Sequence, residues 1–257
     1  MRFDAVVLAG RRPDDPLAAA HGVASKALIE LAGEPMLRRV LRSLEASGQV
    51  RRAVIVGGPE LDPLLTAGSL ELPCRRVDPA GGPSVSAVVG LGATHWPALV
   101  TTADHALLTG AIVREFAAGA TASRADLAIG FADTAAVQQR FPGSARTPLR
   151  FAAQTLCGCN LFAFMNPAAM SAARWWQQVE QQRKRPWRLV RTLGVGYAVN
   201  YLRGRLSLDS ALVRLGELTN CELSAVLIEQ PEAAFDVDCE RDLETCRRQL
   251  APEESAR

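Results

Sequence analysis

Three aspartates and one lysine stand at positions in the sequence from which they can do chemistry together. Asp104 follows an apolar run at 98–102, and Asp236 and Asp238 come just before the last predicted helix. Carboxylates at strand ends can hold a divalent cation that carries the phosphates of a nucleotide. If 235–238 is a strand end, Asp236 and Asp238 point the same way and can face one site. Each aspartate alone also fits a helix cap or a loop.

The lysine closes an unusually long polar loop. The apolar run VVLA ends at Gly10, Arg, Asp and Pro residues follow, and Lys26 then restarts an apolar run. In a parallel sheet, ligands bind beyond the carboxyl ends of the strands, so this loop is expected to lie over a site. Its backbone N–H groups and arginines can hold phosphates, and Gly10 allows close approach of the backbone. G-x-G-x-x-G and G-K-[ST] are both absent, which argues against dinucleotide and Walker-type sites. A polar loop without a ligand remains an alternative.

The elements that position these residues alternate between strand-like and helix-like patterns. Buried strands are predicted at 5–9, 53–57, 98–102 and 126–131. A helix is predicted from Pro35 to Gly48, on an apolar face of Met36, Leu37, Val40, Leu41 and Leu44. Further helices are predicted at 84–93 and 110–119. The alternation predicts βαβ units and a mostly parallel sheet.

The second half of the chain has a different pattern. Residues 142–164 predict a turn and one or two strands, 167–217 are mostly helical, a strand returns near 222–230, and 236–250 reads as a strand end and a final helix. The predicted fold is a three-layer α/β/α domain with a mostly parallel, Rossmann-like mixed sheet. A helical insertion at about 165–218 and a disordered tail at 251–257 complete it.

Composition narrows the class of protein. The chain has 257 residues, 22% of them charged and 48% hydrophobic, with a net charge of +2. This balance is that of a globular domain, and the charge is too small to predict a nucleic-acid partner. No apolar run reaches the length of a membrane span, and Arg11 and Arg12 stand where a signal peptide would need small residues. The six cysteines lack zinc-ligand spacing, so we expect reduced thiols in a cytoplasmic protein.

The start of the chain resembles the start of nucleotidyltransferases with a GT-A-like fold. These include the sugar-1-phosphate nucleotidyltransferases and the MobA-like group. The residues in common are Leu8, Ala9, Gly10, Lys26, Leu28, Gly33, Pro35, Met36 and Leu37. Asp104 falls where those enzymes carry an aspartate after a strand. Asp236-Val-Asp238, followed by Asp242-Leu243, resembles the D-I-D-T-P-E-D-L motif that closes MobA-like domains.

This resemblance implies a reaction and a role for each matched residue. An NTP would donate its NMP group to a phosphorylated small-molecule acceptor, with release of pyrophosphate. Asp104 and Asp238, with Asp236 as a further ligand, would hold Mg²⁺ or Mn²⁺, and Lys26 would offset charge on the α-phosphate. The base and triphosphate would be held by Leu8, Ala9, Gly10, Arg11 and Arg12, and a second loop would contribute Gly82, Ser84 and Ser86 to the base or ribose.

The resemblance also divides the single domain, 1–250. Residues 1–140 would form the nucleotide-binding half, 141–234 the acceptor half, and 235–250 the closing metal-binding motif with its helix. The chain departs from the family pattern at Arg11, which replaces a second glycine, and at Ser25, which replaces a proline or aspartate. The loop length is closer to that of the sugar-nucleotide enzymes, and the closing motif is closer to that of the MobA-like group.

Two other functions remain open from the sequence. Asp236 and Asp238 could serve as the DxD motif of a GT-A glycosyltransferase that uses a nucleotide-sugar. Alternatively, the chain could be a nucleotide-binding or interaction module without catalysis.

For one stretch and three single residues, the sequence allows more than one interpretation. The Trp- and Arg-rich stretch 175–205 could contact a membrane surface, an acceptor phosphate or a second copy, although packing is expected for Trp175, Trp176 and 193–202. Arg146 and Arg150 could reach the acceptor or lie on the surface, and His105 could support the site or be solvated. The nucleotide base, the acceptor and the oligomeric state are left open.

Overall fold

The computed structural model describes residues 1–11, 14–66, 70–144, 146–181 and 194–251. Its main sheet has the order β10-β7-β9-β6-β1-β4-β5, with the short β8 paired to β9. Neighbouring strands are parallel except at β9, which runs antiparallel to β6, β7 and β8. The strands are β1 (Phe3–Ala9), β4 (Val50–Gly57), β5 (Cys74–Val77), β6 (Ala98–Thr102), β7 (Leu127–Asp133), β8 (Leu149–Arg150), β9 (Thr155–Phe164) and β10 (Leu223–Ile228). A two-stranded sheet pairs β2 (Glu30–Leu31) with β3 (Glu34–Pro35).

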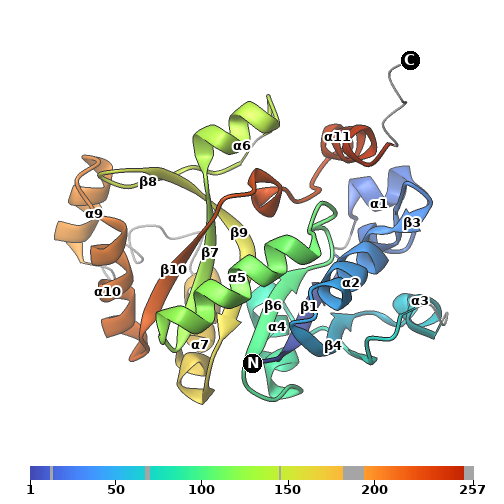
Figure 1. The fold of residues 1–257 in the computed structure, drawn as a ribbon, viewed down its shortest axis with the longest axis horizontal. Coiled ribbons are helices and arrows are strands. Elements are labelled where there is room, and N and C mark those ends of the chain that lie inside the picture. Colours follow the sequence, from blue (N-terminus) through green and yellow to red (C-terminus); the bar gives the residue numbers. More distant parts are fainter. Residues whose placement is uncertain (12–13, 67–69, 145, 182–193, 252–257) are drawn as a thin grey trace.

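Helices cover both faces of the sheet, which gives three layers (Figure 1). On one face, α2 (Met36–Ala46) contacts α5 (Gly110–Ser123); on the other, α4 (Pro83–Gly92) contacts α7 (Met170–Gln181). Strand β1 shows why both layers form, because successive side chains of a strand point to opposite faces. Ala5 and Val7 belong to the core cluster that includes the α2 side chains, and Val6 belongs to the cluster that includes Leu91 of α4.

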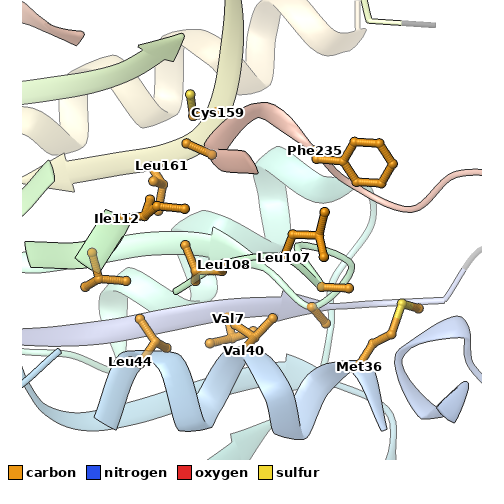
Figure 2. Packing of buried hydrophobic residues seen from close by; sticks show 14 of the residues in the cluster. Val7, Met36, Val40, Leu44, Leu107, Leu108, Ile112, Cys159, Leu161 and Phe235 are labelled. Carbon is orange, nitrogen blue, oxygen red and sulfur yellow. The ribbon is translucent and has the colours of Figure 1, made fainter. Parts of the chain in front are cut away.

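Helix α2 buries the face that its sequence spacing predicts. Met36, Leu37, Val40, Leu41 and Leu44 are all fully buried. Figure 2 shows Val40 and Leu44 of this helix turned toward Val7 of β1, with Leu108 above them. Burial of such a side chain contributes about 1.5–3 kcal/mol, so this stripe anchors the chain that follows Lys26.

Helix α4 lies unusually close to the sheet. A Cβ atom at Gly90 would come within 2.4 Å of Val6 Cγ1 and 2.8 Å of Val56 Cγ2. A larger residue at this position would therefore push α4 away from β1 and β4. The contact fixes the distance between the sheet and α4, the helix whose first turns contain the predicted ligand residues Ser84 and Ser86.

The remaining helices connect or flank the strands. They are α1 (Pro16–Ala20), α3 (Asp62–Thr66), α6 (Thr134–Arg140), α9 (Val195–Leu202), α10 (Leu208–Thr219) and α11 (Glu240–Leu250), with short 3₁₀ turns η1 (Lys26–Leu28), η2 (Pro59–Leu61), η3 (Pro167–Ala169) and η4 (Pro231–Ala234). In the described part of the chain, no helix is long and apolar enough to cross a membrane.

A buried aspartate fixes the edge of the sheet opposite the predicted site. Asp4 is fully buried and accepts hydrogen bonds from Arg51 Nε (2.5 Å), Arg52 Nε (2.8 Å) and the backbone N–H of His95 (2.7 Å). Burial alone would raise the pKa of Asp4, but these hydrogen bonds lower it below its ordinary value. The charged carboxylate thus links the starts of β1 and β4 to the loop before β6.

Most of the predicted elements are confirmed, and several details are wrong. The strand 98–102 and the start of a helix at Gly110 are as predicted. Thr109 caps this helix, since its Oγ1 accepts a hydrogen bond from the N–H of Ile112 (3.2 Å). The polar loop after β1 contains an unpredicted helix, α1. No strand forms at 235–238; this stretch is a loop between η4 and α11.

The packing expected for the second half is also partly wrong. Trp176 is 55% exposed, and none of the residues of α9 is buried. The expected helical region contains α7, α9 and α10, and α7 belongs to the outer layer because it packs on α4. Arg12, Trp187 and the tail at 252–257 lie outside the described residues.

Candidate functional site

Lys26 lies between two of the predicted aspartates at the carboxyl edge of the parallel strands. Its Nζ atom is 2.6 Å from Asp104 Oδ2 and 3.3 Å from Asp238 Oδ1, and it donates a hydrogen bond to the carbonyl of Val237 (3.0 Å). Three oxygen atoms, contributed from two distant parts of the sequence, thus surround one ammonium group. Lys26 is one of two lysines in a chain whose 29 basic residues are otherwise arginine. A lysine supplies the compact point charge that such a small space accepts.

Backbone hydrogen bonds bring these segments together. The N–H of Ala103, after β6, donates to the carbonyl of Leu8 in β1 (2.9 Å). The N–H of Val237 donates to the carbonyl of Asp104 (3.0 Å), so the closing loop (residues 235–239, between η4 and α11) is fixed directly to the segment that follows β6. The meeting of Asp104 and Asp238 therefore depends on main-chain geometry and not only on their attraction to Lys26.

The electrostatics of this cluster keep Lys26 charged. Burial alone would lower the pKa of Lys26, but the carboxylates of Asp104 and Asp238 raise it above its ordinary value. The side chains of Lys26 and Asp104 are 19% and 15% exposed, whereas that of Asp238 is 57% exposed. Asp104 Oδ1 is buried and has no hydrogen-bond partner among the described residues. A buried carboxylate oxygen without a hydrogen-bond partner costs free energy of desolvation. A bound ligand that pairs with this oxygen would recover that cost.

Asp236 does not join this cluster. Its carboxylate forms an ion pair with Arg146 and accepts a hydrogen bond from Asn160 Nδ2 (3.0 Å). Arg146 is itself mostly buried, and its guanidinium lies 4.7 Å from the centre of the Phe235 ring. The strand that would have turned Asp236 and Asp238 toward the same side is absent, so the two carboxylates take different partners.

Asp242 holds the backbone beside Asp238. Its Oδ2 atom accepts hydrogen bonds from the N–H groups of Asp238 (3.0 Å) and Cys239 (3.2 Å) at the start of α11. Arg146 lies 3.7 Å from the other carboxylate oxygen of Asp242. The family resemblance covered Asp242 without giving it a role; its place three residues after the helix cap was the signal for a capping box. Arg146 is thus tied to the closing loop, and Arg150 is exposed on β8.

In the first predicted nucleotide loop, the groups available to a ligand are mostly main-chain groups and not side chains. Ala9 is buried and Leu8 packs against the core, so only their main-chain groups face the loop. A Cβ atom at Gly10 would lie 3.9 Å from Pro79, which places the first and second loops side by side. Arg11 is exposed, and no hydrogen bond or ion pair of its side chain is found within the described residues.

The second predicted loop is occupied by the protein's own groups. The carboxylate of Glu180, near the end of α7, accepts a hydrogen bond from the N–H of Ser84 (3.1 Å) and lies against Gly82. A helix N-terminus favours an anion, and Glu180 supplies one. Ser86 Oγ bonds to the backbone of Ala80 (3.3 Å), and Ser84 Oγ is buried without a partner among the described residues. No pattern in the sequence pointed to Glu180.

Two histidines near the site make contacts within the protein. His105 is 1% exposed, and burial lowers its pKa to about 4, so the ring is neutral. The alternative of a solvated His105 is therefore wrong. His21 Nε2 lies 2.8 Å from Glu240 Oε2, which links α1 in the opening loop to the first turn of α11. The hydrogen bond from His21 is the main cause that lowers the pKa of Glu240.

The residues of the site fit a magnesium or manganese ion that takes most of its ligands from the phosphates of the nucleotide and from water. Among the described residues, no group of three or more His, Cys, Asp or Glu side chains is placed to hold a metal. Mg²⁺ commonly uses only one or two carboxylates and takes its remaining ligands from water and phosphates. Asp104 and Asp238 provide two, and the unpartnered Asp104 Oδ1 provides a free donor atom.

This fold and this site define a class of protein. A mostly parallel sheet with one antiparallel strand carries, at its carboxyl edge, a lysine and two aspartates beside two loops. The arrangement is that of a nucleotidyltransferase. The profile of the MobA-like NTP transferase domain matches residues 5–195. The chain belongs to the MobA-like NTP transferase family.

Solved structures share the fold of this chain. A hypothetical transferase from Thermus thermophilus is similar at 32% identity and a TM-score of 0.81, over 95% of this chain and 100% of that one. The 4-diphosphocytidyl-2C-methyl-D-erythritol synthase of Anaerococcus prevotii shares the fold at 10% identity and a TM-score of 0.59, over 98% and 99% of the two chains. The 2-C-methyl-D-erythritol 4-phosphate cytidylyltransferase of Thermus thermophilus does so at 13% identity and a TM-score of 0.52, over 97% and 98%. Among curated proteins, none matches significantly.

Proposed function

We propose that this nucleotidyltransferase moves an NMP group from an NTP to a phosphorylated small-molecule acceptor in a reaction that requires Mg²⁺ or Mn²⁺. The observation that carries the proposal is the convergence of Asp104 and Asp238 on the ammonium group of Lys26. Asp104 Oδ1 has no partner among the described residues and the side chain of Asp238 is 57% exposed, so both carboxylates can also take the divalent cation that a triphosphate brings with it. The Thermus cytidylyltransferase, whose name specifies a phosphorylated acceptor, has the same fold and supports this choice of acceptor class.

The chain's own residues would divide the work as follows. Asp104 and Asp238 would hold the cation, which supplies Lewis-acid stabilisation of charge on the phosphates when bound. Lys26 reaches the same oxygens and would turn its ammonium to the α-phosphate as the acceptor attacks. The backbone at Leu8–Gly10, with Arg11, would position the nucleotide, and positioning with charge stabilisation would supply most of the rate enhancement.

Four other predicted site residues receive different roles. Gly82 and Ser84 begin a helix whose N–H groups already hold a carboxylate, so they remain candidates for the ribose or a phosphate. Ser86 is kept only as a support of that loop, because its hydroxyl bonds to Ala80. Asp236 is proposed to hold the closing loop through Arg146 rather than to bind the cation directly.

This arrangement of Asp236 also weighs against the glycosyltransferase alternative. That alternative has Asp236 and Asp238 acting together as a DxD pair, but the carboxylate of Asp236 is taken by Arg146 and Asn160. Transfer of a sugar from a nucleotide-sugar, without pyrophosphate release, would nevertheless restore that alternative.

A thermal-shift experiment tests the proposal. The four NTPs are added with and without Mg²⁺ to the wild type and to Asp104→Asn and Asp238→Asn. We expect at least one NTP to raise the melting temperature of the wild type only with Mg²⁺, and to lose this effect in both variants. Asp62→Asn, at an exposed ion pair on α3, is the matched control and should keep the effect. An undiminished NTP effect in both site variants would reject the metal assignment.

A further inference from the structure

Helix α9 has aromatic residues on its inner side. Tyr197 lies beneath the guanidinium of Arg214 in α10, which is 5.6 Å from the ring centre. Tyr201 packs edge-on against Phe151, with ring centres 6.4 Å apart. These contacts attach α9 to the rest of the domain through its tyrosines. Figure 1 shows α9 and α10 beyond β10, the edge strand of the sheet.

Three larger aliphatic side chains of α9 are exposed to solvent to different degrees. Val195, Val199 and Leu202 are 65%, 36% and 84% exposed. Their spacing of four and three residues puts them on one face of the helix. A helix normally buries such a stripe, and grouped exposed aliphatic residues mark an interaction surface. Tyr197 and Tyr201 already make the intramolecular contacts, so this stripe is left for a partner.

The surroundings of the stripe are positively charged. Arg203 and Arg205, directly after α9, are both exposed. Asp209, at the start of α10, is an exposed acid that offsets one positive charge.

We infer that α9 docks this protein reversibly onto an anionic lipid surface. An amphipathic helix with an aliphatic face and flanking arginines inserts that face at the headgroup boundary, while the arginines pair with anionic lipids. A second copy of the chain is a poorer occupant, because symmetric pairing would bring the same arginines together. This inference goes beyond the proposed function and does not depend on it.

Vesicle co-sedimentation of the full chain tests the inference. The probes are vesicles of phosphatidylcholine alone and of phosphatidylcholine mixed with phosphatidylglycerol, at low and high salt. We expect binding only to the anionic vesicles and a weaker affinity at high salt. Arg203→Gln with Arg205→Gln should lower the affinity by about fivefold for each arginine removed. Val199→Glu with Leu202→Glu should reduce it by more than about tenfold.

The controls separate docking from folding and from self-association. Leu227→Glu changes another exposed aliphatic residue, 52% exposed on β10, and should bind like the wild type. Melting temperatures verify that each variant is folded. If the variant with Val199→Glu and Leu202→Glu does not fold, the variant with Arg203→Gln and Arg205→Gln still tests the inference. Absence of binding to anionic vesicles, or equal binding by the α9 variants, would overturn the inference. So would a wild-type dimer that the glutamate pair dissociates while vesicle binding persists.

Discussion

Replacing Lys26 by methionine tests how far the site depends on a cation. The substitution keeps most of the side-chain volume and leaves the carboxylates of Asp104 and Asp238 without their ammonium. Removing one partner of a fully buried ion pair costs about 3–5 kcal/mol. Lys26 and Asp104 are largely buried but Asp238 is 57% exposed, so we expect a loss of about 2 kcal/mol. For a domain of this size, that corresponds to a melting temperature lower by roughly 4–8 °C.

The same variant should gain more from Mg²⁺ than the wild type does. In the wild type, Lys26 is paired with Asp104 Oδ2 and Asp238 Oδ1, which leaves Asp104 Oδ1 to the ion; in Lys26→Met the paired oxygens are available to the ion as well. With Mg²⁺ at about ten times its dissociation constant, the variant should recover roughly 1.4 kcal/mol. The assay is chemical or thermal unfolding of both proteins across a Mg²⁺ titration without nucleotide, so it does not depend on catalysis.

A matched control is available on the surface. Arg76 also bridges two aspartates, Asp62 and Asp78, both of which are exposed. Arg76→Met should leave the response to Mg²⁺ as in the wild type. A Lys26→Met protein as stable as the wild type, or one that gains no more from Mg²⁺, would refute the view that Lys26 holds the place of a cation.

Three further predictions concern single side chains. Asp238→Asn should abolish Mg²⁺-dependent NTP binding in calorimetry, whereas Asp236→Asn should lower the melting temperature and keep that binding; equal loss of binding in both would restore Asp236 as a ligand. Lys26→Ala should lower kcat far more than it raises KM for the NTP in steady-state kinetics, and an effect on KM alone would assign Lys26 to ground-state binding. Asp4→Asn should cost about 2–3 kcal/mol of unfolding free energy at neutral pH, because it leaves two arginines without their buried partner. The folded pKa of Asp4 is lowered, so its contribution is present above the ordinary aspartate pKa and is lost as the pH falls through the folded pKa. Urea unfolding of Asp4→Asn and wild type should therefore converge at acid pH, and a constant difference would contradict this.

The sequence predicted the parts of the fold in which local pattern and burial agree. The run at 98–102 is continuous and apolar and ends at a polar loop, so β6 could be placed to the residue. The face of α2 could be predicted because every member of its apolar stripe is buried. The orientation of β9 could not, because a strand sequence does not carry its direction. Helix α1 was missed because five residues within a polar loop give no periodic signal.

The site was predictable in its residues but not in their partners. Lys26, Asp104 and Asp238 could be found from motif order along the chain, and the structure brings them together. The carboxylate of Asp236 lies away from Lys26 because it pairs with Arg146 and Asn160. These two residues come from the β8–β9 region, so their approach depends on tertiary contacts. The exposure of the α9 stripe was likewise hidden, because an aliphatic residue reads the same in sequence whether it faces the core or solvent.

Transfer of a labelled nucleotidyl group tests the central claim most directly. The full chain is incubated with Mg²⁺, each α-phosphate-labelled NTP in turn and a set of phosphorylated small-molecule acceptors. We predict that label from one NTP appears in an acceptor product with an equal amount of pyrophosphate, and that Asp104→Asn and Asp238→Asn abolish both signals. Sugar transfer from a nucleotide-sugar by the same protein, with no labelled product and no pyrophosphate from any NTP, would contradict the account.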